Sequence, residues 1–293
     1  MGKSIDTLIP DIYEALGEAD VFSPNTPTLF GEESKELFYN EFMNKKNPLS
    51  RGGLRLSNYG MKCERKLWNT VNNPPNKDRL PGPDKFRFFY GDLLEMVVLF
   101  LAKQTGHTVE YEQAEVSLLG VKGHMDAIID GWVVDVKTAA AHYFDKYAKG
   151  NQLRLDDPFG YLPQITAYLA AAGKKDYCTE KNKAAFLFIN KQNGQMYLDK
   201  YDLTKEVSKC ADVMSEKMEL VAGVEPVGRL PAVPYSKTGD NMRLSTDCKF
   251  CFNKHNCWPE LRTFQYSNGP VDLVVVAKEP RVPEVKEDGS HYI

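Results

Sequence analysis

Two apolar runs separated by Asp130-Gly131 constrain the fold of this chain more than any other feature of its sequence. The runs span residues 123–129 and 132–138. An Asp-Gly pair between two such runs is the strongest short-range signal for a β-hairpin. A two-residue turn also fixes the register of the two strands. Counted outward from the turn, the register pairs Ile129 with Trp132, Asp126 with Asp135, and His124 with Lys137.

That register places the carboxylates of Asp126 and Asp135 opposite each other on one face of the hairpin. At about 4 Å and an effective dielectric near 20, their repulsion is about 4 kcal/mol. A hard divalent cation removes this cost, and Mg²⁺ prefers carboxylate oxygens. Lys137 then stands beside the metal, where it can activate water or stabilise charge on a phosphate. A solvated surface hairpin is the alternative, which the apolar flanks disfavour. The other face is expected to lie in a core and carries Met125, Ala127, Val134 and Val136.

Glu95 is a third acidic candidate, because it lies in the otherwise apolar segment 93–99. A buried carboxylate needs a partner or a metal, so Glu95 is either a further metal ligand or a partly exposed side chain. On the helix expected over 161–173, Gln164 and Tyr168 share one face. Glutamine can contact a phosphate or a base edge, and tyrosine can stack. By itself this pair also fits an ordinary amphipathic helix.

Three of the six cysteines form one compact group: Cys248, Cys251 and Cys257. Their spacing suits thiolates that converge on one soft metal centre. Cys63 is the best candidate for the fourth ligand, and His255 could replace one thiolate in a zinc site. Spacing alone does not separate zinc from an iron–sulfur cluster. Cys178 and Cys210 are isolated and are expected to be free thiols.

Composition excludes several classes of protein. The chain has 293 residues, of which 42% are hydrophobic and 26% charged, so a disordered, collagenous or disulfide-framework protein is ruled out. We expect a cytoplasmic protein without a membrane partner, because no apolar run reaches roughly 18 residues and the N-terminus lacks a signal-peptide core. With 37 basic and 40 acidic residues and a net charge of −3, overall charge does not point to nucleic acid.

Hydrophobic periodicity and turn residues predict the remaining elements. Helices are expected over 1–22, near 34–43, and over 57–69, 86–105, 139–150, 161–173 and 204–222. Strands are expected over 108–119, 184–190 and 195–201, with a connector over 23–50 and loops over 72–85 and 151–160. In the helix over 57–69, Tyr59, Cys63 and Leu67 would share one face. The helix over 86–105 is expected to be mostly buried.

Taken in order, these motifs resemble those of the RecB-like branch of the PD-(D/E)XK nuclease superfamily. Asp126 matches the first motif aspartate, and Asp135-x-Lys137 matches the (D/E)-x-K motif. Gln164 and Tyr168 match the QxxxY motif of the branch. With Cys63, the cysteines resemble the one-plus-three arrangement of its iron–sulfur nucleases, which include CRISPR-adaptation exonucleases and AddB-type nuclease domains. The resemblance covers about residues 55–260, and the family often has histidine where Glu95 stands.

The resemblance implies an α/β fold with a restriction-endonuclease-like core: a central mixed sheet flanked by helices, with an iron–sulfur-clamped helical and C-terminal segment. It implies Mg²⁺ or Mn²⁺ held by Glu95, Asp126, Asp135 and the carbonyl of Val136. It also implies a [4Fe–4S] cluster, for which zinc is the alternative, bound by Cys63, Cys248, Cys251 and Cys257. Such a cluster would close a chain loop of roughly 190 residues and so stabilise the fold.

On this basis we expect a metal-dependent DNA exonuclease that processes ends in recombination, repair or phage genome metabolism. Asp126, Asp135 and Lys137 would be catalytic, and Gln164 and Tyr168 would position the strand. Three basic residues near Tyr143, Tyr147 and Phe159 could line the DNA path: Lys146, Lys149 and Arg154.

The alternative is a non-catalytic DNA-binding or assembly subunit that retains the nuclease fold and the cluster. No helicase phosphate loop occurs in the sequence, so a helicase or recombination protein would be a separate partner. The expected organisation is a helical extension and connector over 1–50, a nuclease domain with the cysteine cluster over 51–262, and a tail over 263–293.

Overall fold

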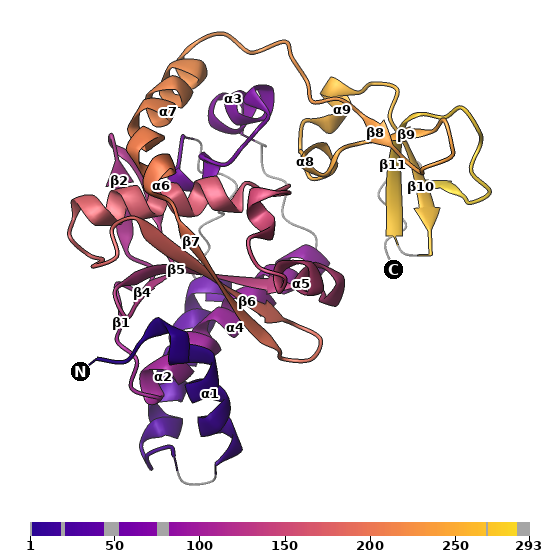
Figure 1. Cartoon of the computed structure of the whole chain (residues 1–293). Helices are drawn as coiled ribbons and strands as arrows, with labels where there is room; N and C mark the ends of the chain where they lie inside the picture. The colour runs from indigo at the N-terminus through magenta and orange to yellow at the C-terminus, as the bar shows by residue number, and fades with distance from the viewer. Residues whose placement is uncertain (1, 19–20, 44–52, 75–81, 268, 286–293) are drawn as a thin grey trace.

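The structure is a computed structural model. It describes residues 2–18, 21–43, 53–74, 82–267 and 269–285. A main body carries most of the chain, and a smaller part at the C-terminal end lies beside it (Figure 1).

A five-stranded mixed sheet forms the centre of the main body, in the order β1-β4-β5-β6-β7. Its strands are β1 (Val109–Glu110), β4 (Ala127–Ile129), β5 (Trp132–Ala139), β6 (Lys183–Asn190) and β7 (Met196–Asp202). β5 and β6 run parallel, and the other neighbours run antiparallel. A parallel pair needs a long crossover, which here contains α5 (Ala141–Tyr147), the short η5 (Gln152–Arg154) and α6 (Tyr161–Lys174).

Helices cover both faces of this sheet, because its strands are apolar on both sides. On one face, α5, α6 and α7 (Thr204–Ala222) pack over side chains such as Val133 and Phe186. On the other face, the short η1 (Ile5–Thr7), α1 (Leu8–Gly17) and α4 (Gly82–Gln104) pack over side chains such as Val134 and Leu187. The expected central mixed sheet flanked by helices is confirmed.

The Asp-Gly turn is confirmed, and the register beyond it is only partly as predicted. Asp130 and Gly131 have φ values of 48° and 82°, and the pairs run from Ile129 with Trp132 to Ala127 with Val134. There β4 begins, and the preceding residues form a separate hairpin of β2 (Glu115–Leu118) with β3 (Val121–His124).

The predicted pairs of Asp126 with Asp135 and of His124 with Lys137 are therefore wrong. His124 pairs with Glu115 instead. Met125 also lies in the core with Val133, rather than on the face of Val134. The physical reason is a side-chain bond: Oδ2 of Asp126 accepts the backbone N–H of Val136 at 2.8 Å. The side chain takes the place of a strand partner, so the ladder stops there.

Several predicted elements differ from the structure. The first helix ends at Gly17, a helix begins at Thr26 within the expected connector, and the strand expected over 108–119 is divided into β1 and β2.

The helix expected over 57–69 is broken into η4 (Leu56–Asn58) and α3 (Glu64–Asn72). Cys63 is the N-cap of α3, so it does not share a helical face with Tyr59 and Leu67. The helix expected to be mostly buried is α4, whose first half is exposed at Phe86 and Phe88. In this half, Phe89 packs against Phe38 of α2 (Thr26–Phe38) and Phe42 of the π-helical turn η2 (Tyr39–Met43).

The smaller C-terminal part is a second, antiparallel five-stranded sheet, in the order β12-β10-β11-β9-β8. Its strands are β8 (Val233–Pro234), β9 (Met242–Arg243), β10 (Arg262–Tyr266), β11 (Gly269–Val275) and β12 (Glu284–Val285). Two short helices precede β10: α8 (Thr246–Lys249) and α9 (Lys254–Cys257). Most of this sheet falls in the segment where a tail was expected, and residues 286–293 lie outside the described residues.

Among the described residues, no helix combines the length and the apolar character that crossing a bilayer requires.

Candidate metal and nucleic-acid site

Asp135 and Lys137 project from β5 on the face that also carries Val133. Asp135 is only 2% exposed. The Nζ atom of Lys137 lies 2.5 Å from Oδ2 of Asp135. The ammonium group of Lys137 thus directly compensates the charge of this buried carboxylate. Burial of a carboxylate is costly unless a cation compensates it, and Lys137 is that cation for Asp135.

Asp126 stands where β4 begins, beside this ion pair. The N–H of Val136 holds one of its carboxylate oxygens in place. Burial raises the pKa of Asp126 well above its usual range, and the charge of Asp135 raises it further. Lys137 and the Val136 N–H act in the opposite direction. Asp126 and Asp135 thus share one site, although they are not a cross-strand pair.

Glu95 reaches the same site from the second half of α4. Burial raises the pKa of Glu95 to about 7, opposed by a hydrogen bond from Gln113 and by the charge of Lys137. Nε2 of Gln113 donates to Oε1 of Glu95 at 2.7 Å. The repulsion of Asp135 also raises the pKa. The third acid expected from the sequence is therefore close to the other two.

Lys137 is held as a cation by its neighbours. Burial by itself would lower its pKa, but the charges of Asp135 and Asp126 outweigh burial and raise it. The ammonium group also lies 5.3 Å from the centre of the Tyr161 ring, within the range of a cation–π contact. A permanently charged ammonium can orient water and stabilise an anion, but it does not readily accept a proton.

Gln164 and Tyr168 lie on α6, as predicted, and contact each other. Nε2 of Gln164 donates to the Tyr168 hydroxyl at 3.3 Å. The Tyr168 ring is buried against β3, and a Cβ on Gly123 would lie 2.8 Å from Cε1 of that ring. Burial raises the pKa of Tyr168, and Asp135 and Asp126 raise it too. The pair therefore faces the acidic site.

Two of the three basic residues expected along a DNA path are already paired with acids. Nζ of Lys146 lies 2.6 Å from Oδ2 of Asp156. Nη1 of Arg154 lies 2.7 Å from Oε1 of Glu206. Lys149 is exposed at the end of α5. These partners reduce the positive charge that Lys146 and Arg154 would offer to a phosphate.

Gln113 and Tyr161 also belong to the site, although nothing in the sequence predicted it: Gln113 contacts Glu95, and Tyr161 contacts Lys137. Gln113 lies on the turn between β1 and β2 and has a φ of 50°. Tyr161 is the first residue of α6. Neither belongs to a periodic pattern that points to the acids, because only the tertiary fold brings them there.

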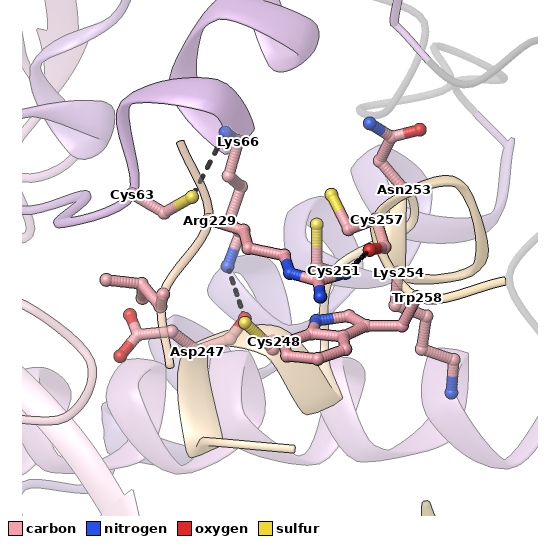
Figure 2. A pocket seen from close by; sticks show the side chains of 11 residues that line it. Cys63, Lys66, Arg229, Asp247, Cys248, Cys251, Asn253, Lys254, Cys257 and Trp258 are labelled. Carbon is pink, nitrogen blue, oxygen red and sulfur yellow. Dashed lines mark hydrogen bonds between the residues drawn. The ribbon is translucent and has the colours of Figure 1, made fainter. Parts of the chain in front are cut away.

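The four predicted cysteine ligands line one cavity between α3 and the C-terminal part: Cys63, Cys248, Cys251 and Cys257. Figure 2 shows Cys63 on the α3 side and the other three sulfurs across the cavity from it. Arg229 extends between them and stacks 3.5 Å from the centre of the Trp258 ring. Its guanidinium also donates to the carbonyl of Cys257.

Cations surround these thiols. Burial raises the pKa of Cys251, and Lys66 lowers it. Burial likewise raises the pKa of Cys257, and Arg65 lowers it. Four thiols on one cavity are the donor set of a zinc or iron–sulfur site. The free thiols Cys178 and Cys210 are buried in the main body, away from this cavity.

Within the described ranges, no three His, Cys, Asp or Glu side chains are arranged so that they could hold a metal ion. The donors fit by chemistry at both places, and a metal would have to draw them closer together.

Comparisons with known proteins give little further information. No protein-family model matches the chain, and no curated protein matches it. Among solved structures, the chain is similar to "Crystal structure of SSO0001", with a TM-score of 0.39 and 14% sequence identity. The alignment covers 76% of this chain and 95% of that one. A similarity of this size does not assign a family.

Proposed function

We propose that this chain is a metal-dependent DNA exonuclease of the RecB-like PD-(D/E)XK type. The observation that carries the proposal is the buried ion pair of Asp135 with Lys137, next to two more acids that one lysine cannot neutralise. Those acids, Asp126 and Glu95, have pKa values raised chiefly by burial. Perturbed titratable groups that converge in this way are typical of reactive sites.

Asp126, Asp135 and Glu95 would hold Mg²⁺ or Mn²⁺, and the backbone of Val136 lies beside them. A divalent cation bound there supplies a Lewis acid that polarises the scissile phosphate. The bond from the Val136 N–H fixes one oxygen of Asp126, which leaves the other oxygen for the metal. The electrostatic repulsion among the acids provides the driving force for binding it.

Lys137 would orient the attacking water and stabilise negative charge on the phosphate. Its raised pKa suits charge stabilisation rather than proton removal. Gln164 and the Tyr168 hydroxyl, which contact each other beside the acids, would position the strand by hydrogen bonds to phosphate oxygens.

The cysteine cavity would hold a structural [4Fe–4S] cluster, with zinc as the alternative. Its donors come from the N-cap of α3 and from the segment 248–257. A centre there would link the C-terminal part to the main body.

A non-catalytic DNA-binding or assembly subunit is the second candidate. A scaffold gains nothing from three acids gathered near a buried lysine, since replacing buried charges with apolar side chains is often neutral or stabilising. The retained charges at Asp126, Asp135 and Lys137 therefore favour the enzyme.

The test is a degradation time course on DNA labelled at the 5′ or the 3′ end, with Mg²⁺ or Mn²⁺ and with EDTA. Asp135→Asn should reduce the rate at least about 100-fold. Asp199→Asn is the matched control, because Asp199 is also a buried strand aspartate but bonds to Tyr201 and to the N–H of Asn151. The proposal fails if the metal-loaded protein degrades no DNA, or if Asp135→Asn is as active as the control.

A further inference from the structure

We propose that a row of aromatic rings beside Lys137 stacks the bases of a single DNA strand and so guides that strand to the acids. The aromatic row consists of His142, Tyr143, Phe159 and Tyr161. The inference rests on the proposed function, since it names the form of DNA that the site takes: single-stranded DNA or a frayed end with unpaired bases.

The rings follow one another away from Lys137. Tyr161 lies 5.3 Å from the Lys137 ammonium, measured to the ring centre. Phe159 follows at 5.3 Å from Tyr161, with 27° between the ring planes. Tyr143 lies 6.4 Å from Phe159 in an edge-to-face arrangement, and His142 lies 4.1 Å from Tyr143. The row thus links the ion pair of the acidic site to the surface of α5.

Part of the row is open to solvent, as a surface that binds bases must be. Phe159 is 40% exposed. His142 is exposed too, whereas Tyr143 and Tyr161 are half-buried. The exposed ring of Phe159 offers an apolar face on which a base could stack. Every base has an aromatic face, so a stacking surface accepts single strands of any sequence.

The loop that carries Phe159 is held firmly on both sides. Asp157 accepts the backbone N–H groups of Tyr161 and Leu162 at 3.0 and 2.8 Å. Nζ of Lys62 donates to the carbonyl of Asp157 at 2.6 Å. On the other side, Gly160 lies against the backbone of Gly60. A ring fixed in advance loses little conformational entropy when a base stacks on it.

The charges around the row also favour stacking over phosphate binding. Lys146 and Arg154 are paired with Asp156 and Glu206, and the chain carries a net charge of −3. Affinity that comes from phosphate contacts alone needs several free cations. An unpaired strand offers bases to the row, whereas the bases of a duplex are stacked on each other.

The experiment measures equilibrium binding of a fluorescent dT12 oligonucleotide to the full chain in EDTA, so that no hydrolysis occurs. The second probe is the same oligonucleotide with abasic sites. Phe159→Ala should weaken binding of dT12 roughly 5- to 100-fold, and Phe159→Trp should preserve it. Phe88→Ala is the matched control, because Phe88 is an exposed phenylalanine on α4, which covers the opposite face of the sheet.

The abasic probe identifies stacking. It should bind weakly to the wild type, and Phe159→Ala should weaken it no further, because the base and the ring act as one pair. Equal binding by wild type and Phe159→Ala, or an equal loss in Phe88→Ala, would overturn the inference. Base-dependent binding without metal-dependent hydrolysis would instead overturn the proposed function, but it would support base stacking on the aromatic row.

Discussion

At the scale of single residues, two acids of the site, Glu95 and Asp126, oppose folding at neutral pH when no metal is bound. Burial raises the pKa of Glu95 to about 7, so the folded state holds a proton that the unfolded chain releases at lower pH. The stability of the metal-free protein is therefore highest below the unfolded pKa and falls as pH rises toward 7. Asp126 contributes in the same direction, because its pKa is also raised.

Glu95→Gln should consequently stabilise the metal-free protein at pH 7.5, by roughly 1–3 kcal/mol, and change its stability little at pH 4.5. The substituted amide can still accept the hydrogen bond from Gln113, so the packing is preserved. Urea unfolding in EDTA at the two pH values measures both effects. If the variant is less stable at pH 7.5, Glu95 is a structural residue and the account of this acid is wrong.

Metal binding should show the complementary dependence on pH. Protons compete with the cation for Glu95 and Asp126, so Mn²⁺ should raise the melting temperature of the wild type more at pH 7.5 than at pH 5.5. Glu95→Gln should reduce that gain.

At this scale Asp126, Asp135 and Lys137 could be grouped from the sequence because they lie near a recognisable turn, and Glu95 stood out as an acid in an apolar segment. The sequence did not identify Gln113 and Tyr161, since the loop and the helix start that carry them reach the site only through tertiary packing.

At the scale of elements, two glycines decide how α6 meets the segment that leads to Cys63. A Cβ on Gly160 would lie 2.2 Å from the carbonyl oxygen of Gly60, and a Cβ on Gly60 would lie 2.1 Å from the carbonyl oxygen of Gly160. Gly160 also has a φ of 71°, which favours glycine. Since the obstructing atoms are backbone, neither element can accept a methyl group without moving.

Gly160→Ala should therefore destabilise the protein by about 1–3 kcal/mol and should reduce DNA degradation, because α6 carries Gln164 and Tyr168. Gly173→Ala on the same helix is the control. A Cβ there would meet nothing within 4 Å, so that variant should gain about 0.5–1 kcal/mol. Urea unfolding of both proteins measures the contrast. Equal stability of the two variants would show that the close approach of the backbones does not matter.

The hairpin shows what could be predicted for an element and what could not. The Asp-Gly turn and the first three pairs followed from local sequence chemistry. The break at Asp126 did not follow, because a bond between its side chain and the N–H of Val136 replaces the strand pairing that alternation alone would continue. Helical periodicity likewise could not show that the helix expected over 57–69 is interrupted near Gly60, whose backbone lies against that of Gly160.

At the scale of the whole molecule, the cysteine cavity lies between α3 of the main body and the C-terminal part. Cys63 caps α3 in the main body, and the other three cysteines belong to the C-terminal part. Lys66 of α3 also donates to the carbonyl of Asp247 at 3.2 Å. A metal centre that closes so long a loop should stabilise the whole fold.

Cys248→Ala should abolish binding of the metal centre and lower the melting temperature by about 5 °C or more. Cys178→Ala is the control, since Cys178 is also a buried thiol but lies away from the cavity, and it should retain the metal. Iron, sulfide and zinc contents of anaerobically purified protein, with thermal melts, give the readout and separate a cluster from zinc. If Cys248→Ala binds the same metal as the wild type, Cys248 is not one of its ligands.

The spacing of Cys248, Cys251 and Cys257 was enough to group these three, whereas only the fold brings Cys63 to the same cavity. The small C-terminal sheet was not predictable in the same way, because β8, β9 and β12 have two residues each and leave no periodic pattern.

The most direct test of the central claim is single-turnover hydrolysis of an end-labelled oligonucleotide in saturating Mn²⁺ by the wild type, Lys137→Ala and Lys181→Ala. Lys181 is an exposed lysine paired with Asp176, so its loss removes the same charge at a distance from the site. The account predicts that Lys137→Ala is at least about 100-fold slower than the wild type and that Lys181→Ala keeps the wild-type rate. Equal rates for all three proteins, or no hydrolysis by the wild type, would contradict it.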